Sequence, residues 1–169
     1  MSAGPFFGKY RGSVVNNTDP ERKGRIQASV PDVLGEQTSS WAMPCLPLAG
    51  QGMGLFTVPP TGSGVWIEFE RGDPDYPIWT GGFWGGSSET PSQSQQVTPG
   101  TDAVTLQTSS GHFFQVSDVP GTGGLTLQTA SGAKISISDT GIVIDNGKGA
   151  KIELSGPSID MNSGALKVV

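Results

Sequence analysis

The sequence has very little of the residues from which covalent cross-links and most metal sites are built. Its 169 residues include one cysteine and one histidine. No disulfide can therefore form within the chain, and we expect no cofactor. The single thiol, Cys45, lies between prolines and apolar residues, so we interpret it as a small buried hydrophobic side chain.

Basic residues and long apolar runs are also scarce. The chain has 10 Lys and Arg against 15 Asp and Glu, a formal net charge of −5. Because nucleic-acid binding needs clustered basic side chains against phosphates, we do not expect nucleic acid as a partner. No apolar stretch approaches the roughly 18 residues of a membrane-spanning helix, and the N-terminal residues lack the pattern of a signal peptide. We therefore expect synthesis in the cytoplasm without a signal peptide.

Turn-forming residues and a short repeat are what the sequence does contain. It has 26 glycines and 13 prolines and few runs of helix-forming residues, which favours an all-β fold. In the last third, the segment Leu106–Asp118 is echoed 21 residues later by Leu127–Asp139, and Gly132–Ser138 returns as Gly149–Ser155. A repeat of this length is typical of an array of similar supersecondary units.

Within the repeats, apolar residues occur in pairs separated by one polar residue. This alternation is that of a β-strand with one buried face. Turn residues such as Ser131-Gly132 and Asn146-Gly147 separate the pairs, so the pattern predicts eight short strands joined by sharp corners. The side chains predicted to form the core are Val104, Leu106, Phe114, Val116, Leu125, Leu127, Ile135, Ile137, Ile142, Ile144, Ile152, Leu154, Ile159, Met161, Leu166 and Val168.

Eight such pairs are too few to close a core within one chain, because small cores are only marginally stable without a cross-link or a partner. We therefore predict that residues 103–169 form a needle whose inward face is completed by other copies of the chain. The simplest arrangement is a homotrimer, an intertwined or side-by-side triple β-prism that is also described as a trimeric β-helix. A single-chain β-sandwich would use the same alternation, although its strands are usually longer than three or four residues.

The first 85 residues differ from the needle. Five strands with Gly-rich corners are predicted there, which suits a small closed barrel of the OB type. The polar stretch that follows shows no apolar periodicity and is predicted to be a linker. We thus expect an OB-fold barrel at 1–85, a linker at 86–102 and the needle at 103–169. The predicted barrel strands are Phe7–Val15, Gly24–Val30, Phe56–Val58, Gly64–Glu70 and Pro77–Phe83.

Three segments of the predicted barrel carry a resemblance to a known family. They are Gly8–Val15, Asp19–Gln27 and Pro59–Gly81, and the strand-turn-strand signature of the third is specific. Together they resemble the OB domain of the central spike of contractile tails. That family includes the phage baseplate assembly protein V group and the VgrG-like spikes of type VI secretion and phage-tail-like injection particles. Its members follow the OB domain with a trimeric β-helical needle.

The resemblance implies a homotrimeric structural protein that pierces membranes. The OB domain would attach to a hub protein of the baseplate, and sheath contraction would drive the needle through the envelope of the target cell. Because the sheath supplies the work, no catalysis is implied and the chain is not expected to be an enzyme. The protein would then be a virion component, or part of an extracellular or cytoplasmic injection particle.

Two departures from familiar members of the family shape these expectations. Some members carry a lysozyme domain between barrel and needle, where this chain has the polar stretch from 86 to 102, so muralytic activity is not expected. Other members end in a tip that binds iron through a His-x-His motif. This chain has only His112, so we expect a separate small conical tip protein at the C-terminal end of the needle.

His112 itself allows two interpretations. It shares strand parity with Phe114, so three copies of it on a three-fold axis could hold a metal ion. The repeat, however, aligns it with Ala133 beside a Ser-Gly corner, where an exposed position is easily adopted. The exposed corner is the favoured interpretation.

The predicted barrel contains one basic cluster. Arg22, Lys23 and Arg25 are possible contacts with an acidic surface of the hub, although exposed loop charges usually contribute little. OB barrels also bind single-stranded nucleic acid and sugars, but the acidic balance of the chain and the missing basic groove disfavour such binding here.

Large aromatic side chains in a small barrel are expected to pack in the core or at subunit interfaces. The chain's tryptophans are Trp41, Trp66, Trp79 and Trp84.

Four carboxylates also cluster in this part of the sequence. Glu68, Glu70, Asp73 and Asp75 could form an acid/base pair or a cation site. The two glutamates alternate with apolar residues, as on the exposed face of a strand, and the two aspartates flank a proline in a turn. A structural role is therefore the favoured interpretation.

Two other functions stay open. A trimeric receptor-binding fibre or adhesin would use the same needle as a β-helical stalk, although such fibres usually place a larger binding head at the distal end. An enzyme such as a polysaccharide-cleaving solenoid comes third, because the repeats contain no clustered acid/base set. Hydrolysis assays on peptidoglycan and polysaccharides would separate the enzyme from the other two.

Overall fold

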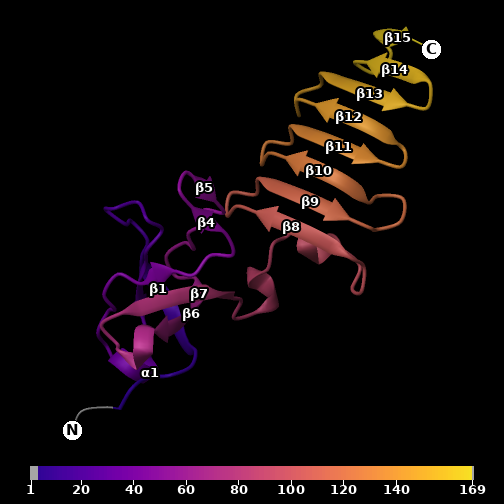
Figure 1. Ribbon diagram of the computed structural model, residues 1–169. Coiled ribbons are helices and arrows are strands. Elements are labelled where there is room, and N and C mark those ends of the chain that lie inside the picture. The colour runs from indigo at the N-terminus through magenta and orange to yellow at the C-terminus, as the bar shows by residue number, and fades with distance from the viewer. Residues whose placement is uncertain (1–3, 169) are drawn as a thin grey trace. The chain divides into compact units, whose positions relative to one another are not determined.

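The computed structural model describes residues 4–168, which form β-strands, loops and a few short helical turns. The chain divides into two compact units, residues 1–87 and 88–169 (Figure 1). The first unit contains a five-stranded sheet and the second an eight-stranded sheet. These findings confirm the predicted all-β fold class.

The first unit is built on five short strands. Along the sheet their order is β2 (Gln27–Ser29), β1 (Tyr10–Asn16), β6 (Gly64–Phe69), β7 (Pro77–Phe83) and β3 (Met43–Pro44). Neighbouring strands are antiparallel except β3 and β7, which are parallel. The longer strands bury alternate side chains, as in β6, whose odd-numbered residues face the core.

Two contacts outside the named strands close this sheet into a barrel. Ile26, which precedes β2, and Ala42, which precedes β3, exchange backbone hydrogen bonds of 3.2 and 2.7 Å. Ser39 adds a second link: its amide donates to the Ala28 carbonyl (2.9 Å), and its hydroxyl accepts the Ala28 amide proton (2.9 Å). The two edge strands are thereby joined, which removes the exposed edges that an open sheet would present.

The barrel encloses a core of nine residues, each at most 5% exposed. Burying a large apolar side chain contributes about 1.5–3 kcal/mol, so this core is the main source of stability in the first unit. The one polar atom of the Trp79 side chain is satisfied, because its indole Nε1 donates to the Gly24 carbonyl at 3.0 Å. The core residues are Val14, Ile26, Ala28, Val30, Ala42, Val65, Ile67, Phe69 and Trp79.

Three local predictions for this unit are wrong. Phe56–Val58 is not a strand; the third strand of the barrel is β3, in a proline-rich stretch where no strand is predicted. Val58 packs against the core while Phe56 is exposed, which produces apolar alternation without strand pairing. Cys45 is exposed rather than buried. A short helix, α1 (Pro31–Leu34), follows β2, where only the end of a strand was expected.

Between β3 and β6 the chain forms a small hairpin. Its strands, β4 (Ala49–Gly50) and β5 (Met53–Gly54), pair with each other as a two-stranded sheet separate from the barrel. Three short 3₁₀ helices complete the irregular parts of the described chain. They are η1 (Glu70–Gly72), which lies between β6 and β7, η2 (Ser87–Glu89) and η3 (Ser94–Gln96).

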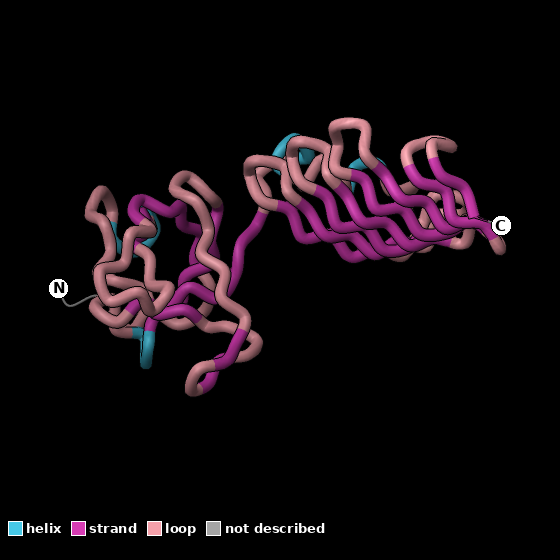
Figure 2. The backbone as a smooth tube through the Cα atoms, turned by 90° about the horizontal axis from the view of Figure 1, so that it is seen from above, coloured by secondary structure: helices cyan, strands magenta, loops and turns pink. Residues whose placement is uncertain are grey.

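The second unit is an antiparallel sheet of eight strands in sequence order. Each strand pairs with the strands before and after it, so the sheet is a continuous meander, and Figure 2 shows the strands side by side. The eight predicted strands are confirmed. Their bounds are β8 (Ala103–Gln107), β9 (Phe113–Ser117), β10 (Gly124–Gln128), β11 (Lys134–Ser138), β12 (Gly141–Asp145), β13 (Lys151–Ser155), β14 (Ser158–Met161) and β15 (Leu166–Val168).

The corners between the strands repeat as the sequence does. After β8, the Thr108 amide donates to the His112 carbonyl (2.9 Å), and the Thr108 hydroxyl accepts the His112 amide proton (3.2 Å). Thr129 and Ala133 close the corner after β10 in the same way, at 2.9 and 3.1 Å. Equivalent bonds close the corner after β12. Each repeat of the sequence is therefore one hairpin of the sheet.

Candidate functional site: the apolar face of the eight-stranded sheet

Strand pairing arranges the predicted core residues of the second unit in two rows. In each hairpin an apolar residue lies opposite another, for example Leu125 opposite Ile137 and Leu127 opposite Ile135. Because this register holds at all seven pairings, two continuous apolar ladders cross the sheet. The first ladder is Val104, Val116, Leu125, Ile137, Ile142, Leu154, Ile159 and Val168. The second is Leu106, Phe114, Leu127, Ile135, Ile144, Ile152, Met161 and Leu166.

Both ladders lie on one face of the sheet, because residues two apart in a strand point the same way. Among the fifteen ladder residues whose side-chain exposure the structure describes, eleven are at least 36% exposed in the single chain, with Leu106 at 60% and Ile137 at 46%. A contiguous apolar surface of this kind marks an interaction site. A single-chain β-sandwich needs a second sheet against this face, and residues 88–168 form one sheet only.

The opposite face of the sheet is mostly polar, with Phe113 and Val143 among its few apolar residues, and is partly covered by the chain itself. The Gln115 side chain donates to the Gln93 carbonyl (3.2 Å) and to the Thr105 hydroxyl (3.0 Å). The Gln107 side-chain oxygen accepts the Gln93 amide proton at 3.2 Å. Residues 91–97, in the stretch that we predict to be a linker, therefore lie against the polar side of β8 and β9. The apolar ladders stay uncovered.

Charged side chains on the polar face fix the register further along the sheet. Lys151 pairs with Glu153 at 2.9 Å, and this hydrogen bond raises the pKa of the Lys151 ammonium group. Across the strands, Lys151 lies opposite Asp145, and Lys134 lies on the other side of Asp145. Opposite charges in cross-strand positions stabilise a pairing, whereas a slip of one residue would carry them to the apolar face.

His112 lies at the first corner of the sheet, just before β9. Its side chain is exposed, and its Nδ1 accepts the Ala130 amide proton at 3.3 Å. This hydrogen bond leaves Nε2 as the nitrogen that could bind a metal ion. Within the described residues, no group of three His, Cys, Asp or Glu side chains is placed to hold a metal ion. His112 is thus an exposed corner residue, as in the favoured interpretation of the sequence.

The predicted hub contact divides into a structural part and a surface part. Arg25 donates to the Asp19 carboxylate through Nε (3.1 Å) and Nη2 (2.7 Å), and its guanidinium lies over the Trp41 ring. The same carboxylate accepts the amide protons of Lys23 and Arg25, at 2.7 and 3.2 Å. Arg25 and these hydrogen bonds hold the pKa of the Asp19 carboxyl far below its usual range. Arg22 and Lys23 are exposed, and their contact with a hub stays a prediction.

The clustered carboxylates of the barrel make contacts that belong to its surface. Glu68 forms an ion pair with Lys9 at 2.7 Å. The Asp73 carboxylate accepts the Asp75 amide proton at 3.0 Å, as in an Asx turn. These are the contacts of an exposed strand and a turn.

The tryptophans lie in four different environments: Trp79 in the core, Trp66 against Phe83, Trp41 beside Arg25, and Trp84 exposed.

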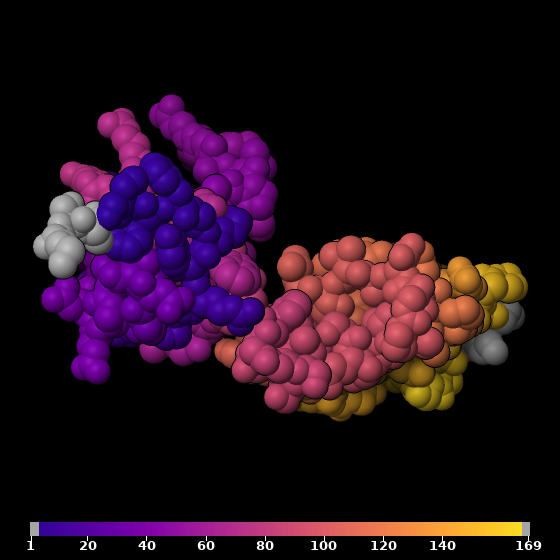
Figure 3. All heavy atoms as spheres, turned by 90° about the horizontal axis from the view of Figure 1, so that it is seen from below, coloured from indigo at the N-terminus to yellow at the C-terminus, as the bar shows by residue number. Residues whose placement is uncertain are grey.

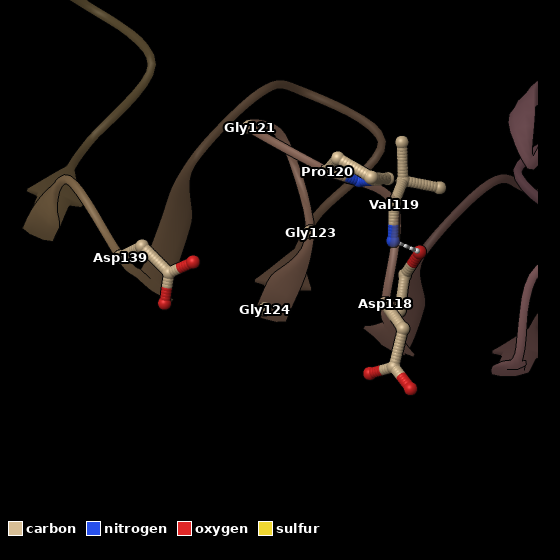
Figure 4. Close-up of a pocket in the computed structure, with 8 residues that line it drawn as sticks. Asp118, Val119, Pro120, Gly121, Gly123, Gly124 and Asp139 are labelled. Carbon is tan, nitrogen blue, oxygen red and sulfur yellow. Dashed lines mark hydrogen bonds between the residues drawn. The ribbon is translucent and has the colours of Figure 1, made fainter.

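A small pocket of about 280 Å³ lies at the corner between β9 and β10. Three of its eight described lining residues are glycines. The two carboxylates in it, Asp118 and Asp139, come from different corners of the sheet and lie apart (Figure 4). Neither a histidine nor a basic residue stands beside them among the described residues that line the pocket.

The architecture of the two units indicates a class of protein. A closed barrel is joined to a sheet whose two apolar ladders are left uncovered by the described residues, which is typical of a structural protein that assembles with a partner. Among the residues that the structure describes, no helix is long and apolar enough to cross a membrane.

Comparison with protein families identifies both parts of the chain. Residues 10–84 match the type VI secretion system/phage-baseplate injector OB domain, and residues 103–167 match the phage baseplate V C-terminal trimerisation domain. The chain belongs to the phage baseplate assembly protein V family of spike proteins, which confirms the resemblance seen in its sequence. Comparison with curated proteins gave no match. The two family matches support a spike-type structural role in a baseplate and a homotrimer.

Proposed function

We propose that the chain is the central spike at the baseplate of a contractile phage tail or a phage-tail-like injection system. Three copies pack the ladder faces of their sheets together, and the sixteen ladder residues of each copy form the core of the needle. The uninterrupted ladders carry this proposal, because a single chain leaves them exposed. The barrel occupies 1–85, the linker 86–102 and the needle 103–169.

The strand pairing favours the side-by-side form of the triple prism. Each of β9 to β14 is hydrogen-bonded on both sides by its own chain. Contacts between copies are then made by side chains, with three sheets forming the sides of a prism around the axis. Burying a fully exposed ladder side chain contributes about 1.5–3 kcal/mol, and this contribution recurs at every strand along the needle.

Such a needle suits a load applied along its axis. Successive strands are hydrogen-bonded from one end of the sheet to the other, and the ladders connect the same layers through the core. We propose that sheath contraction supplies the work of puncturing the target envelope, so the chain needs no catalytic group and is not an enzyme. The barrel attaches the spike to the baseplate hub, and a separate conical tip protein covers the far end of the needle.

The baseplate injector match favours this spike over the receptor-binding fibre or adhesin. A fibre would require a binding head, whereas the described residues of the second unit are occupied by the meander and the segment that lies against it.

The mass of the full-length chain in solution tests the proposal, with two variants of one strand. Ile137→Asp places a charge on the first ladder. Ser136→Asp places the same charge on the polar face of β11 and is the matched control. We expect wild type and Ser136→Asp to be trimers by light scattering and Ile137→Asp to be monomeric. A monomeric wild-type protein would overturn the proposed function.

A further inference from the structure

The barrel unit carries an apolar projection that the needle does not use. Residues 37–67 contain no charged side chain, although the chain as a whole is acidic. In the middle of this stretch, the hairpin β4–β5 and its flanks expose Leu48, Met53, Leu55 and Phe56 by 46% to 66%. Figure 1 shows the hairpin apart from β1, β6 and β7, and in Figure 3 the spheres coloured for residues near 50 project from the body of the first unit.

The hairpin has a defined shape despite its short strands. A two-stranded hairpin alone is marginally stable in water, and β4 and β5 have two residues each. The Leu55 amide donates to the Leu48 carbonyl at 3.0 Å and extends the pairing. A Cβ on Gly50 would lie 2.9 Å from the Met53 sulfur, so Met53 packs across the facing strand. The exposed apolar tip is therefore an ordered element, suited to insertion into a partner.

The same unit contains a pocket whose lining is largely apolar, as the exposed tip of the hairpin is. It has a volume of about 340 Å³ and lies beside β3 and the start of β7. Its described lining includes no residue of the hairpin, so tip and pocket are separate features. Pockets of this size with few polar groups are typical binding sites for apolar groups. The lining includes Trp41, Met43, Pro44, Cys45, Tyr76 and Ile78, with the acidic residues Glu70 and Asp75.

We infer that the hairpin of one copy inserts into this pocket of the next copy, so that the three barrels form a ring of their own. The inference rests on the homotrimer of the proposed function. A trimeric needle tethers three barrels to one particle, and residues 86–90, which precede the stretch that lies against the sheet, span at most about 18 Å. The effective concentration of one barrel for another is then in the millimolar range, which favours a second copy over any separate protein.

The net charge of the chain and the symmetry of the trimer both favour a second copy as the partner that receives the hairpin. Copies with a net charge of −5 repel one another, and the hairpin and the pocket residues 41–45 lie in the uncharged stretch 37–67, so Glu70 and Asp75 are the only charged residues of the described pocket lining. The tip and the pocket are different surfaces, so the contact is heterologous. A heterologous contact closes into a ring when the copies are related by a three-fold axis.

A disulfide test uses the native thiol. Cys45 is exposed and lines the pocket, and Met53→Cys adds a second thiol at the tip of the hairpin. The full-length variant is oxidised in dilute solution and analysed on a denaturing gel without reductant. We expect covalent trimers that dithiothreitol separates, because each copy is bonded to the next. A bond within one chain would leave the mass at that of a single chain, and a two-fold contact would give dimers.

Control variants and a mass measurement separate this inference from the proposed function. Met53→Cys combined with Cys45→Ser should give no covalent trimers, and neither should Val15→Cys, which places a thiol at another exposed apolar position of the barrel. Leu55→Cys repeats the test from a second position if Met53→Cys does not fold. If light scattering shows a trimer but the oxidised protein gives only covalent dimers, or no covalent species at all, the ring alone is overturned. Monomers by light scattering overturn the proposed function and the ring together.

Discussion

Gly141 lies so close to Leu154 that a Cβ atom on the glycine would stand 2.1 Å from the Leu154 carbonyl oxygen. The φ angle of Gly141 is +143°, which side chains disfavour. Gly124 stands in the same relation to the Ile137 carbonyl, also at 2.1 Å. These glycines begin β12 and β10, so the close approach recurs along the sheet and determines how tightly its hairpins pack.

We expect Gly141→Ala to destabilise the sheet more than its backbone angle alone explains. Gly149→Ala is the matched control, because Gly149 also has a positive φ, +102°, while nothing lies within 4 Å of its Cβ position. Backbone strain alone costs about 1–3 kcal/mol, and Gly141→Ala adds a steric clash with a backbone carbonyl. Thermal unfolding should show the larger loss for Gly141→Ala. Equal losses in the two variants would contradict the role of the close approach.

The pairing of Asp19 with Arg25 predicts a dependence of stability on acid pH. Arg25 lowers the pKa of the folded carboxyl, so the stabilisation is fully present above the ordinary Asp pKa of about 4 and is lost as the pH falls below it. Asp19→Asn should therefore unfold at a lower temperature than wild type at pH 7, and the difference should narrow below about pH 4. Asp32→Asn, at an exposed position of α1, is the control.

Melting curves at neutral and acid pH measure this effect. A difference between Asp19→Asn and wild type that has the same size at both pH values would show that the charge of Asp19 does not act through Arg25.

Gln115 is predicted to hold residues 91–97 against the sheet. Gln115→Ala removes the hydrogen bonds to the Gln93 carbonyl and the Thr105 hydroxyl, so amide exchange in 91–97 should become several-fold faster. The trimer should persist, because the residue lies on the polar face. Gln128→Ala changes the same residue type on that face of β10 and should leave the exchange of 91–97 as it is. Unchanged exchange in Gln115→Ala would refute the predicted role.

The surface part of the basic cluster makes a prediction about the hub. Reversing both charges, in Arg22→Glu with Lys23→Glu, should weaken binding to the baseplate hub protein by roughly tenfold at low salt, and by less at high salt, because exposed charges are screened. Binding of purified full-length trimers to the hub measures this. Lys148→Glu, at an exposed needle corner, should bind as wild type does. Equal binding by all three proteins would exclude Arg22 and Lys23 from the hub contact.

The second unit could be predicted closely from the sequence because its signals are local. Alternation identifies each strand, and a corner such as the one that Thr129 and Ala133 close brings the next strand back at once. Short corners leave little freedom of register, so Leu127 and Ile135 meet as the pattern implies. Which residues cover the polar face was not visible, because Gln93 and Gln115 are hydrogen-bonded across 22 positions of sequence.

The barrel was harder to predict at its shortest strand. β3 consists of Met43–Pro44, too few residues for alternation to show, and a proline is one of them. Phe56–Val58 has the alternation but lacks partners, and Cys45 has apolar neighbours in sequence yet an exposed position in space. In each case the deciding contacts come from β7 and from the residues beside β2.

The amino-acid order of this protein is sufficient to decide which side chains share a face of each long strand and where each hairpin turns, because both depend on neighbours within a few residues. Folding in three dimensions decides how the barrel closes, through Ile26 and Ala42, and which face of the needle the chain covers, through Gln93 and Gln115. These contacts join residues far apart in the chain. The geometry of these contacts is set by the packing of whole strands and loops against one another, and no pattern within a few residues of sequence indicates it.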